Sequence, residues 1–280
     1  MTPAILRESD VALVRPTEAP SRRTLSHEST TGGTLPSGRR SRWFYPLTAL
    51  AMLVLTVIGF SHFYLRGQAY PGRPLTPEIR GVLIAHGVSM SAWILLFVIQ
   101  PWLIAARRYR AHMILGRLGS VLAAGVVMLG IWTAFAAARS ASVEMRWFGM
   151  NANQFIAIPL ISVAMFGGFV AAAIAMRRRP QVHKALMLLG TLSAMSAPLG
   201  RIDTLTNLYV GTIFERAFSA FPATLALGLI LLAVKFALER SLDRAMAIGI
   251  VVLTAAYWLT SQVARTEPWE RLMAGLIGAW

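Results

Sequence analysis

Residues 81–110 read GVLIAHGVSMSAWILLFVIQPWLIAARRYR, and this stretch decides how the chain folds. Its first 26 residues, 81–106, contain no Asp, Glu, Lys or Arg. At about 1.5 Å per residue, a helix of that length exceeds the roughly 30 Å hydrocarbon core of a bilayer. Arginines follow immediately, as is typical of a helix end at a membrane surface. The stretch therefore predicts a transmembrane helix.

The composition of the whole chain supports the same prediction. Hydrophobic residues make up 56% of the 280 residues and charged residues only 14%, which is more apolar surface than one soluble core can bury. The formal net charge is +15, but the basic residues stand between apolar blocks, so we expect a lipid bilayer rather than nucleic acid as the partner. Because the chain has no Cys, neither disulfides nor thiolate metal ligands are available.

Six further apolar stretches predict an all-α, polytopic membrane protein with about seven transmembrane helices. The fifth and sixth stretches are the least regular, because Arg201 and Asp203 interrupt the apolar run, and the fifth helix could continue past them toward Tyr209. An even number of spans would place the C-terminus on the other side of the membrane. The predicted spans are residues 46–65, 81–106, 118–138, 147–176, 185–200, 217–234 and 245–264.

Basic residues are concentrated in alternate loops, after the second, fourth and sixth spans. The positive-inside rule then predicts a cytoplasmic N-terminus and, with seven spans, an outer C-terminus in a bacterial inner membrane. Lys235, at the inner end of the sixth span, is expected to extend toward the membrane surface. The loop residues are Arg107, Arg108, Arg110, Arg117, Arg177, Arg178, Arg179, Lys184, Arg240 and Arg244.

Three regions follow from these patterns. Residues 1–42 are rich in Ser, Thr, Pro, Gly and Arg and predict a disordered basic cytoplasmic tail, whose last arginines suit anionic lipid. Residues 43–267 predict the transmembrane helical bundle. Residues 268–280 are too short to cross a bilayer and predict an outer interfacial segment, with Trp269, Leu272 and Leu276 toward the lipid.

Four histidines of the bundle are candidate ligands. His62 and His86 belong to the outer half, whereas His112 and His183 stand at the inner ends of their spans. Neutral imidazole binds haem iron and copper, and helix bundles hold such centres with facing histidines. We therefore predict a b-type haem or copper site at His86 with His62, or a haem at the inner pair. Alternatively, these side chains only bond to neighbouring helices, cap helix ends or contact lipid phosphate.

One face of the second span is polar, because His86, Ser89, Trp93 and Gln100 recur at helical spacing. Polar groups in hydrocarbon need partners, so we expect this face to point into the bundle. His86 and Gln100 are therefore candidate cofactor-binding residues.

Arg201, near the outer end of the fifth span, is a further candidate cofactor-binding residue. Its guanidinium suits a haem propionate or a quinone carbonyl. Alternatively, Arg201 forms a local ion pair with Asp203. The polar residues with which it could form an outer cluster are His86, Asn151, Asn153, Gln154 and Asp203.

A weak internal repeat relates two hairpins. The segments RRYRAH at 107–112 and RRPQVH at 178–183 each end in a His that is followed seven residues later by Gly119 or Gly190. The repeat predicts that spans two to five form a four-helix core. The positive-inside rule alone would also produce two arginine-rich turns.

These motifs carry a resemblance over residues 80–201. His86 in a span, the His-x-x-x-Gly-Arg turn that begins at His112 and the His-Lys-x-Leu-Met turn that begins at His183 resemble a family of uncharacterised bacterial multi-pass membrane proteins. The arrangement is also loosely similar to transmembrane b-type cytochromes. It departs from a two-haem pattern, because the position of the second hairpin that corresponds to His86 is Ala157. The leading expectation is a haem or copper protein of electron transfer or respiratory-complex assembly. The alternative is a non-catalytic subunit beside other membrane subunits, or a small-solute transporter.

Overall fold

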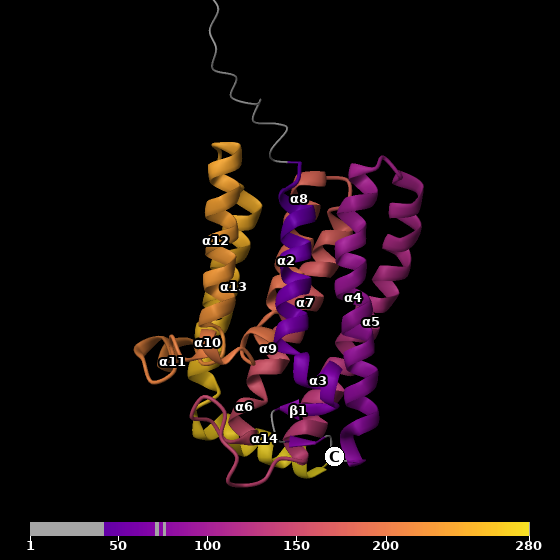
Figure 1. Cartoon of the computed structure of the whole chain (residues 1–280). Coiled ribbons are helices and arrows are strands. Elements are labelled where there is room, and N and C mark those ends of the chain that lie inside the picture. Colours follow the sequence, from indigo (N-terminus) through magenta and orange to yellow (C-terminus); the bar gives the residue numbers. More distant parts are fainter. Residues whose placement is uncertain (1–41, 71–72, 75–76, 280) are drawn as a thin grey trace, which may run out of the picture. The chain divides into compact units, whose positions relative to one another are not determined.

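The computed structural model describes residues 42–70, 73–74 and 77–279 (Figure 1). The predicted tail, residues 1–42, lies outside this part of the chain except for Arg42. The described residues belong to one compact unit. Its elements are α2 (Phe44–Gly59), α3 (Ser61–Arg66), β1 (Gln68–Tyr70), β2 (Arg73–Pro74), α4 (Pro77–Ala105), α5 (Tyr109–Arg139), α6 (Ala152–Phe155), α7 (Ala157–Ala175), α8 (Pro180–Ser193), α9 (Ser196–Leu199), α10 (Asp203–Thr206), α11 (Ile213–Phe218), α12 (Pro222–Glu239), α13 (Arg244–Val263) and α14 (Glu267–Ala279).

Five helical segments in the described part of the chain are long and apolar enough to cross a membrane. They are α4, α5, residues 152–175 with α6 and α7, α12 and α13. The chain is therefore a multi-pass helical membrane protein. The first and fifth predicted spans correspond to α2, with 16 residues, and α8, with 14. Both run beside the longer helices (Figure 1), but their length alone does not make them spans, so the count of seven stays a prediction.

The surface of the long helices is apolar, as lipid contact requires. Large side chains in the middle of α4, α5 and α13 are 63 to 74% exposed, and a soluble protein rarely exposes so many together. These residues are Val88, Val121, Met128, Ile248 and Val251.

The apolar core is centred on α8, whose Ala185, Leu188, Leu189 and Leu192 are almost completely buried. Helix α8 packs along α7 and also against α12 and α13, while α4 packs along α5 and α5 along α7. Close approach depends on small residues. A Cβ atom at Gly249 of α13, for example, would lie 2.1 Å from Leu189 Cδ1. The core thus joins α8 to helices outside the predicted four-helix unit, and that unit stays a prediction.

The two ends of the helices differ in composition. The turns α4–α5, α7–α8 and α12–α13 lie at one end, which we call the arginine end (Figure 1). They hold Arg107, Arg178 and Arg240, among other basic residues. Helices α3, α6 and α14 lie at the opposite end, the α14 end (Figure 1). The three loops that the sequence predicts to be cytoplasmic therefore share one end.

Helix α14 covers part of the α14 end by packing on α6 and α5. Asn151 Nδ2 donates to Glu270 Oε1 at 2.5 Å, and Gln154 Nε2 donates to Oε2 at 3.1 Å. Trp269 Nε1 donates to Asn153 O at 3.1 Å. We expected Trp269 to face the lipid, but it contacts protein instead. Its N–H is bonded to Asn153 O, and its ring packs against the apolar core. Leu272 and Leu276 are exposed.

Candidate functional site

A cavity of about 340 Å³ lies among α2, α3, α4, α5, α7 and α9. An apolar cavity of about 150 Å³ can hold benzene, so this one has room for a molecule roughly twice as large. Among the described residues that line it there is no Asp, Glu or Lys. Its apolar lining includes Phe60, Phe63, Met90, Val163, Phe166 and Met195.

His86 of α4 lines this cavity, and Gly130 of α5 makes room for it. A Cβ atom at Gly130 would lie 3.4 Å from His86 Cε1 and 2.7 Å from Val163 Cγ2. His86 Nδ1 is buried and has no hydrogen-bond partner among the residues that the structure describes. A buried imidazole nitrogen without a partner is costly, whether it carries a proton or a lone pair. A ligand with a hydrogen-bonding group would remove that cost.

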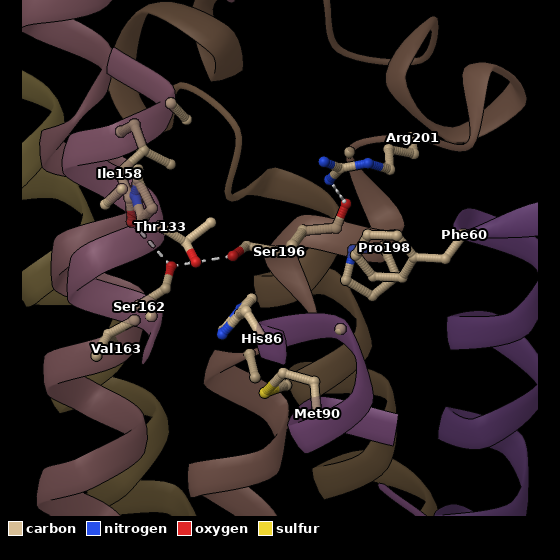
Figure 2. Close-up of a pocket in the computed structure, with 18 of the residues that line it drawn as sticks. Phe60, His86, Met90, Thr133, Ile158, Ser162, Val163, Ser196, Pro198 and Arg201 are labelled. Atoms are coloured by element: carbon tan, nitrogen blue, oxygen red, sulfur yellow. Dashed lines mark hydrogen bonds between the residues drawn. The ribbon is translucent and has the colours of Figure 1, made fainter. Parts of the chain in front are cut away.

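Three hydroxyl groups lie beside His86 (Figure 2). Thr133 Oγ1 of α5 is buried and also lacks a partner within the described ranges. Ser162 of α7 and Ser196 of α9 are hydrogen-bonded to each other at 3.0 Å, and Ser162 Oγ donates to Ile158 O at 2.9 Å. We call His86, Thr133, Ser162 and Ser196 the polar corner. Four helices thus place polar groups at one position in an apolar cavity.

Arg201 lines the same cavity, just after α9. Its Nη1 donates to Ala197 O at 2.7 Å, and the guanidinium lies 4.7 Å from the centre of the Phe60 ring. Its charge is close enough to act on His86. The structure therefore brings Arg201 and His86 to one cavity, whose wall also carries Pro198 and the polar corner (Figure 2). The side chains of Asn151 and Gln154, which we expected in an outer cluster around Arg201, bond to Glu270 of α14.

The remaining predicted site residues lie elsewhere. His62 belongs to α3 and is not among the residues that line the cavity. His112 and His183 lie at the arginine end, close enough to interact electrostatically. His183 Nδ1 is 2.8 Å from Ala173 O, and Gln100 Nε2 donates to His112 O at 3.4 Å. No group of three or more His, Cys, Asp or Glu side chains that could hold a metal occurs in the described part. Haem and copper binding stay predictions.

Three of the four residues on the polar face of α4 point toward other helices. His86 and Trp93 line the cavity, and Gln100 donates to His112 O of α5. Trp93 is buried, and its Nε1 donates to Thr191 Oγ1 of α8 at 3.2 Å. Ser89, by contrast, donates to His86 O of its own helix at 2.8 Å. The interhelical bond of Trp93 fixes the side of α4 that carries His86.

Lys235 forms a second buried polar site, at the arginine end. The expectation that it extends to the membrane surface is wrong, because it is only 1% exposed. Its Nζ is 2.7 Å from Asp243 Oδ2 and 3.2 Å from Glu239 Oε2, and 5.4 Å from the centre of the Tyr45 ring. The ion pairs hold the side chain inside. The spacing of Lys235, Glu239 and Asp243, four residues apart, was the signal in the sequence.

Asp243 connects this site to the start of α13. Its Oδ1 accepts from Met246 N at 3.1 Å, which caps the helix. Burial raises the pKa of Asp243, but hydrogen bonds from Lys235 and the Met246 N–H outweigh burial and hold the pKa below its usual value. The carboxylate therefore stays ionised and paired.

Compared with protein-family models, curated proteins and solved structures, the chain has no match. The resemblance stated for residues 80–201 accordingly stays a prediction.

Proposed function

We propose that this chain is an integral membrane protein that binds a membrane-soluble amphiphile in the cavity. The apolar body of the ligand lies among the aromatic and methionine side chains. Its one hydrogen-bonding head group lies at the polar corner. The observation that carries the proposal is that His86 Nδ1 and Thr133 Oγ1, on adjacent helices beside the same cavity, are buried and have no hydrogen-bond partner among the described residues.

Physical chemistry favours such a ligand over a fully apolar or a fully polar one. A hydrocarbon would leave both polar atoms unpaired, at a cost of about 1–3 kcal/mol each. A small polar solute would leave the rings of Phe60, Phe63 and Phe166 without contacts and would lose its own hydration. An amphiphile satisfies both parts of the cavity, and the bilayer is its natural source.

The proposal includes an orientation. If the arginine end is cytoplasmic, as the positive-inside rule predicts, the cavity lies in the outer half of the bundle, because Figure 1 places α3 and α9 toward the α14 end. A bacterial inner membrane remains our proposed location, and seven spans the proposed topology. The ligand would then come from the outer leaflet.

Photo-crosslinking tests the proposal. We expect dodecanol with a diazirine on its chain to label residues that line the cavity in the full chain in lipid nanodiscs. Thr133→Val keeps the shape but removes the hydroxyl, and loss of one hydrogen bond of about 1 kcal/mol predicts roughly fivefold weaker binding. Thr254→Val is the matched control, because Thr254 Oγ1 donates only to Ile250 O of its own helix.

Two results would contradict the proposal. One is labelling confined to the lipid-facing side chains of α4 and α5, such as Val88 and Val121. The other is equal loss of binding in the Thr133 and Thr254 variants.

A metal-binding function is the second candidate. His86 and Met90, one helical turn apart, both line the cavity, and imidazole and thioether groups bind haem iron and copper. An absorption spectrum and metal analysis of purified protein test it. A haem band, or copper, that disappears in His86→Ala would support this function, whereas a colourless and metal-free preparation after growth with haem and copper would rule against it.

A further inference from the structure

We infer that the head group of the ligand is an anion, and that the cavity takes a fatty-acid-type carboxylate which Arg201 recognises together with the polar corner. This inference rests on the proposed function and names its ligand class.

The charges around the cavity carry the first step. Arg201 is the one residue with a permanent formal charge among the described residues that line it. Its guanidinium is held at the cavity wall by the bond to Ala197 O and by the Phe60 ring. A planar guanidinium with five N–H donors suits a carboxylate, to which it can donate two parallel hydrogen bonds.

The hydrogen-bonding groups carry the second step. Thr133 Oγ1 has a proton to donate and no acceptor among the described residues. His86 offers a donor from one ring nitrogen in its neutral form. Ser162 already donates to Ile158 O, and its contact with Ser196 satisfies the pair. Thr133, His86 and Arg201 therefore offer hydrogen-bond donors to the cavity. An ionised carboxylate can only accept hydrogen bonds, so it matches these groups.

The apolar lining carries the third step. Beyond the head-group wall, the cavity is formed by Phe63, Met90, Phe166 and other apolar side chains. Such a wall gains free energy from contact with methylene groups, at about 0.8 kcal/mol for each one buried. A chain of methylenes behind the carboxylate is thus favoured over a small acid. A cationic amphiphile is disfavoured, because Arg201 would repel its head.

A comparison of two probes with the same chain tests the inference. Dodecanoate and dodecanol, each with a diazirine at the same carbon, are bound to the full chain in nanodiscs at a pH at which the acid is ionised. We expect wild-type protein to bind the acid about tenfold more tightly, the effect of one charge-assisted hydrogen bond. Arg201→Gln should remove this preference, so that the affinity ratio of acid to alcohol falls to about one. Arg216→Gln is the control, because Arg216 is exposed on α11 and does not line the cavity.

Each outcome decides a different question. Equal binding of acid and alcohol by wild-type protein would overturn the inference while leaving the proposed function in place. Equal loss of both probes in Arg201→Gln would show a structural role for Arg201 and would also overturn it. Displacement of dodecanoate by acetate at similar concentration would refute the need for a chain. Absence of binding of either probe would refute the proposed function itself.

Discussion

Gly59→Ala tests the closest backbone contact next to the cavity. A Cβ atom at Gly59, the last residue of α2, would lie 2.2 Å from Pro198 O and 2.7 Å from Pro198 C of α9. Ordinary contact begins at 3.4 Å, so the two backbones must separate by about 3.4 − 2.2 = 1.2 Å. Overpacking costs about 1–3 kcal/mol, and the upper value applies because a backbone carbonyl cannot rotate away. Ala gains up to about 1 kcal/mol of helix propensity over Gly. The net loss of stability is therefore about 2 kcal/mol.

Gly168→Ala is the matched control for this prediction. Gly168 lies inside α7, and a Cβ atom there would meet nothing within 4 Å. The variant should therefore be unchanged or stabilised by up to about 1 kcal/mol. Unfolding by SDS in mixed micelles measures both variants against wild type. A Gly59→Ala protein as stable as Gly168→Ala would refute the packing of α2 on α9 described above.

Three further predictions concern the polar sites at the two ends. Lys235→Met should destabilise the protein by about 3 kcal/mol in the same assay, because it leaves Asp243 and Glu239 without their buried cation. As a control, Arg271→Met removes an exposed ion pair and should cost less than about 1 kcal/mol. Because the pKa of Asp243 is lowered by folding, its stabilising contribution is complete above the unfolded pKa of about 3.9 and is lost as the pH falls through the folded value. In wild-type protein the unfolding midpoint should therefore decrease as the pH falls below about 4, and in Asp243→Asn this decrease should be smaller. The same decrease in both proteins would argue against the pairing. Glu270→Gln should speed hydrogen exchange in α14 without affecting α13, since it weakens the bonds from Asn151 and Gln154.

The helices themselves could be predicted from the sequence. The apolar block at 81–106 corresponds to α4, and the block at 245–264 to α13, within four residues at each end. The predicted span at 147–176 begins later, because Trp147 and Met150 form a turn and Asn151 with Gln154 caps the new helix. Apolar composition alone contains no information on such a turn. The length of a stretch without charged residues is a local property, so it can be determined from the sequence without knowledge of the fold.

The cavity was only partly predictable. The polar face of α4 indicated that His86 points inward, since hydrocarbon forces polar groups to find partners. The partners could not be identified, because Thr133 and Ser196 have ordinary sequence surroundings and come together through helix packing. Gly130 shows why: whether it faces lipid or makes room for His86 depends on which helix lies beside it. Lys235 is buried because Glu239 and Asp243 pair with it, and hydropathy alone contains no information on such pairs.

Cysteine accessibility measures most directly whether these helices form a membrane bundle with all arginine turns on one side. The chain has no native Cys, so single variants at Arg108, Arg178 and Leu242 report on the arginine end, and variants at Val143 and Leu208 on the other. In intact cells, a membrane-impermeant maleimide should label only the cysteines at 143 and 208, and permeabilisation should expose the other three. Labelling of position 108, 178 or 242 in intact cells would contradict the account.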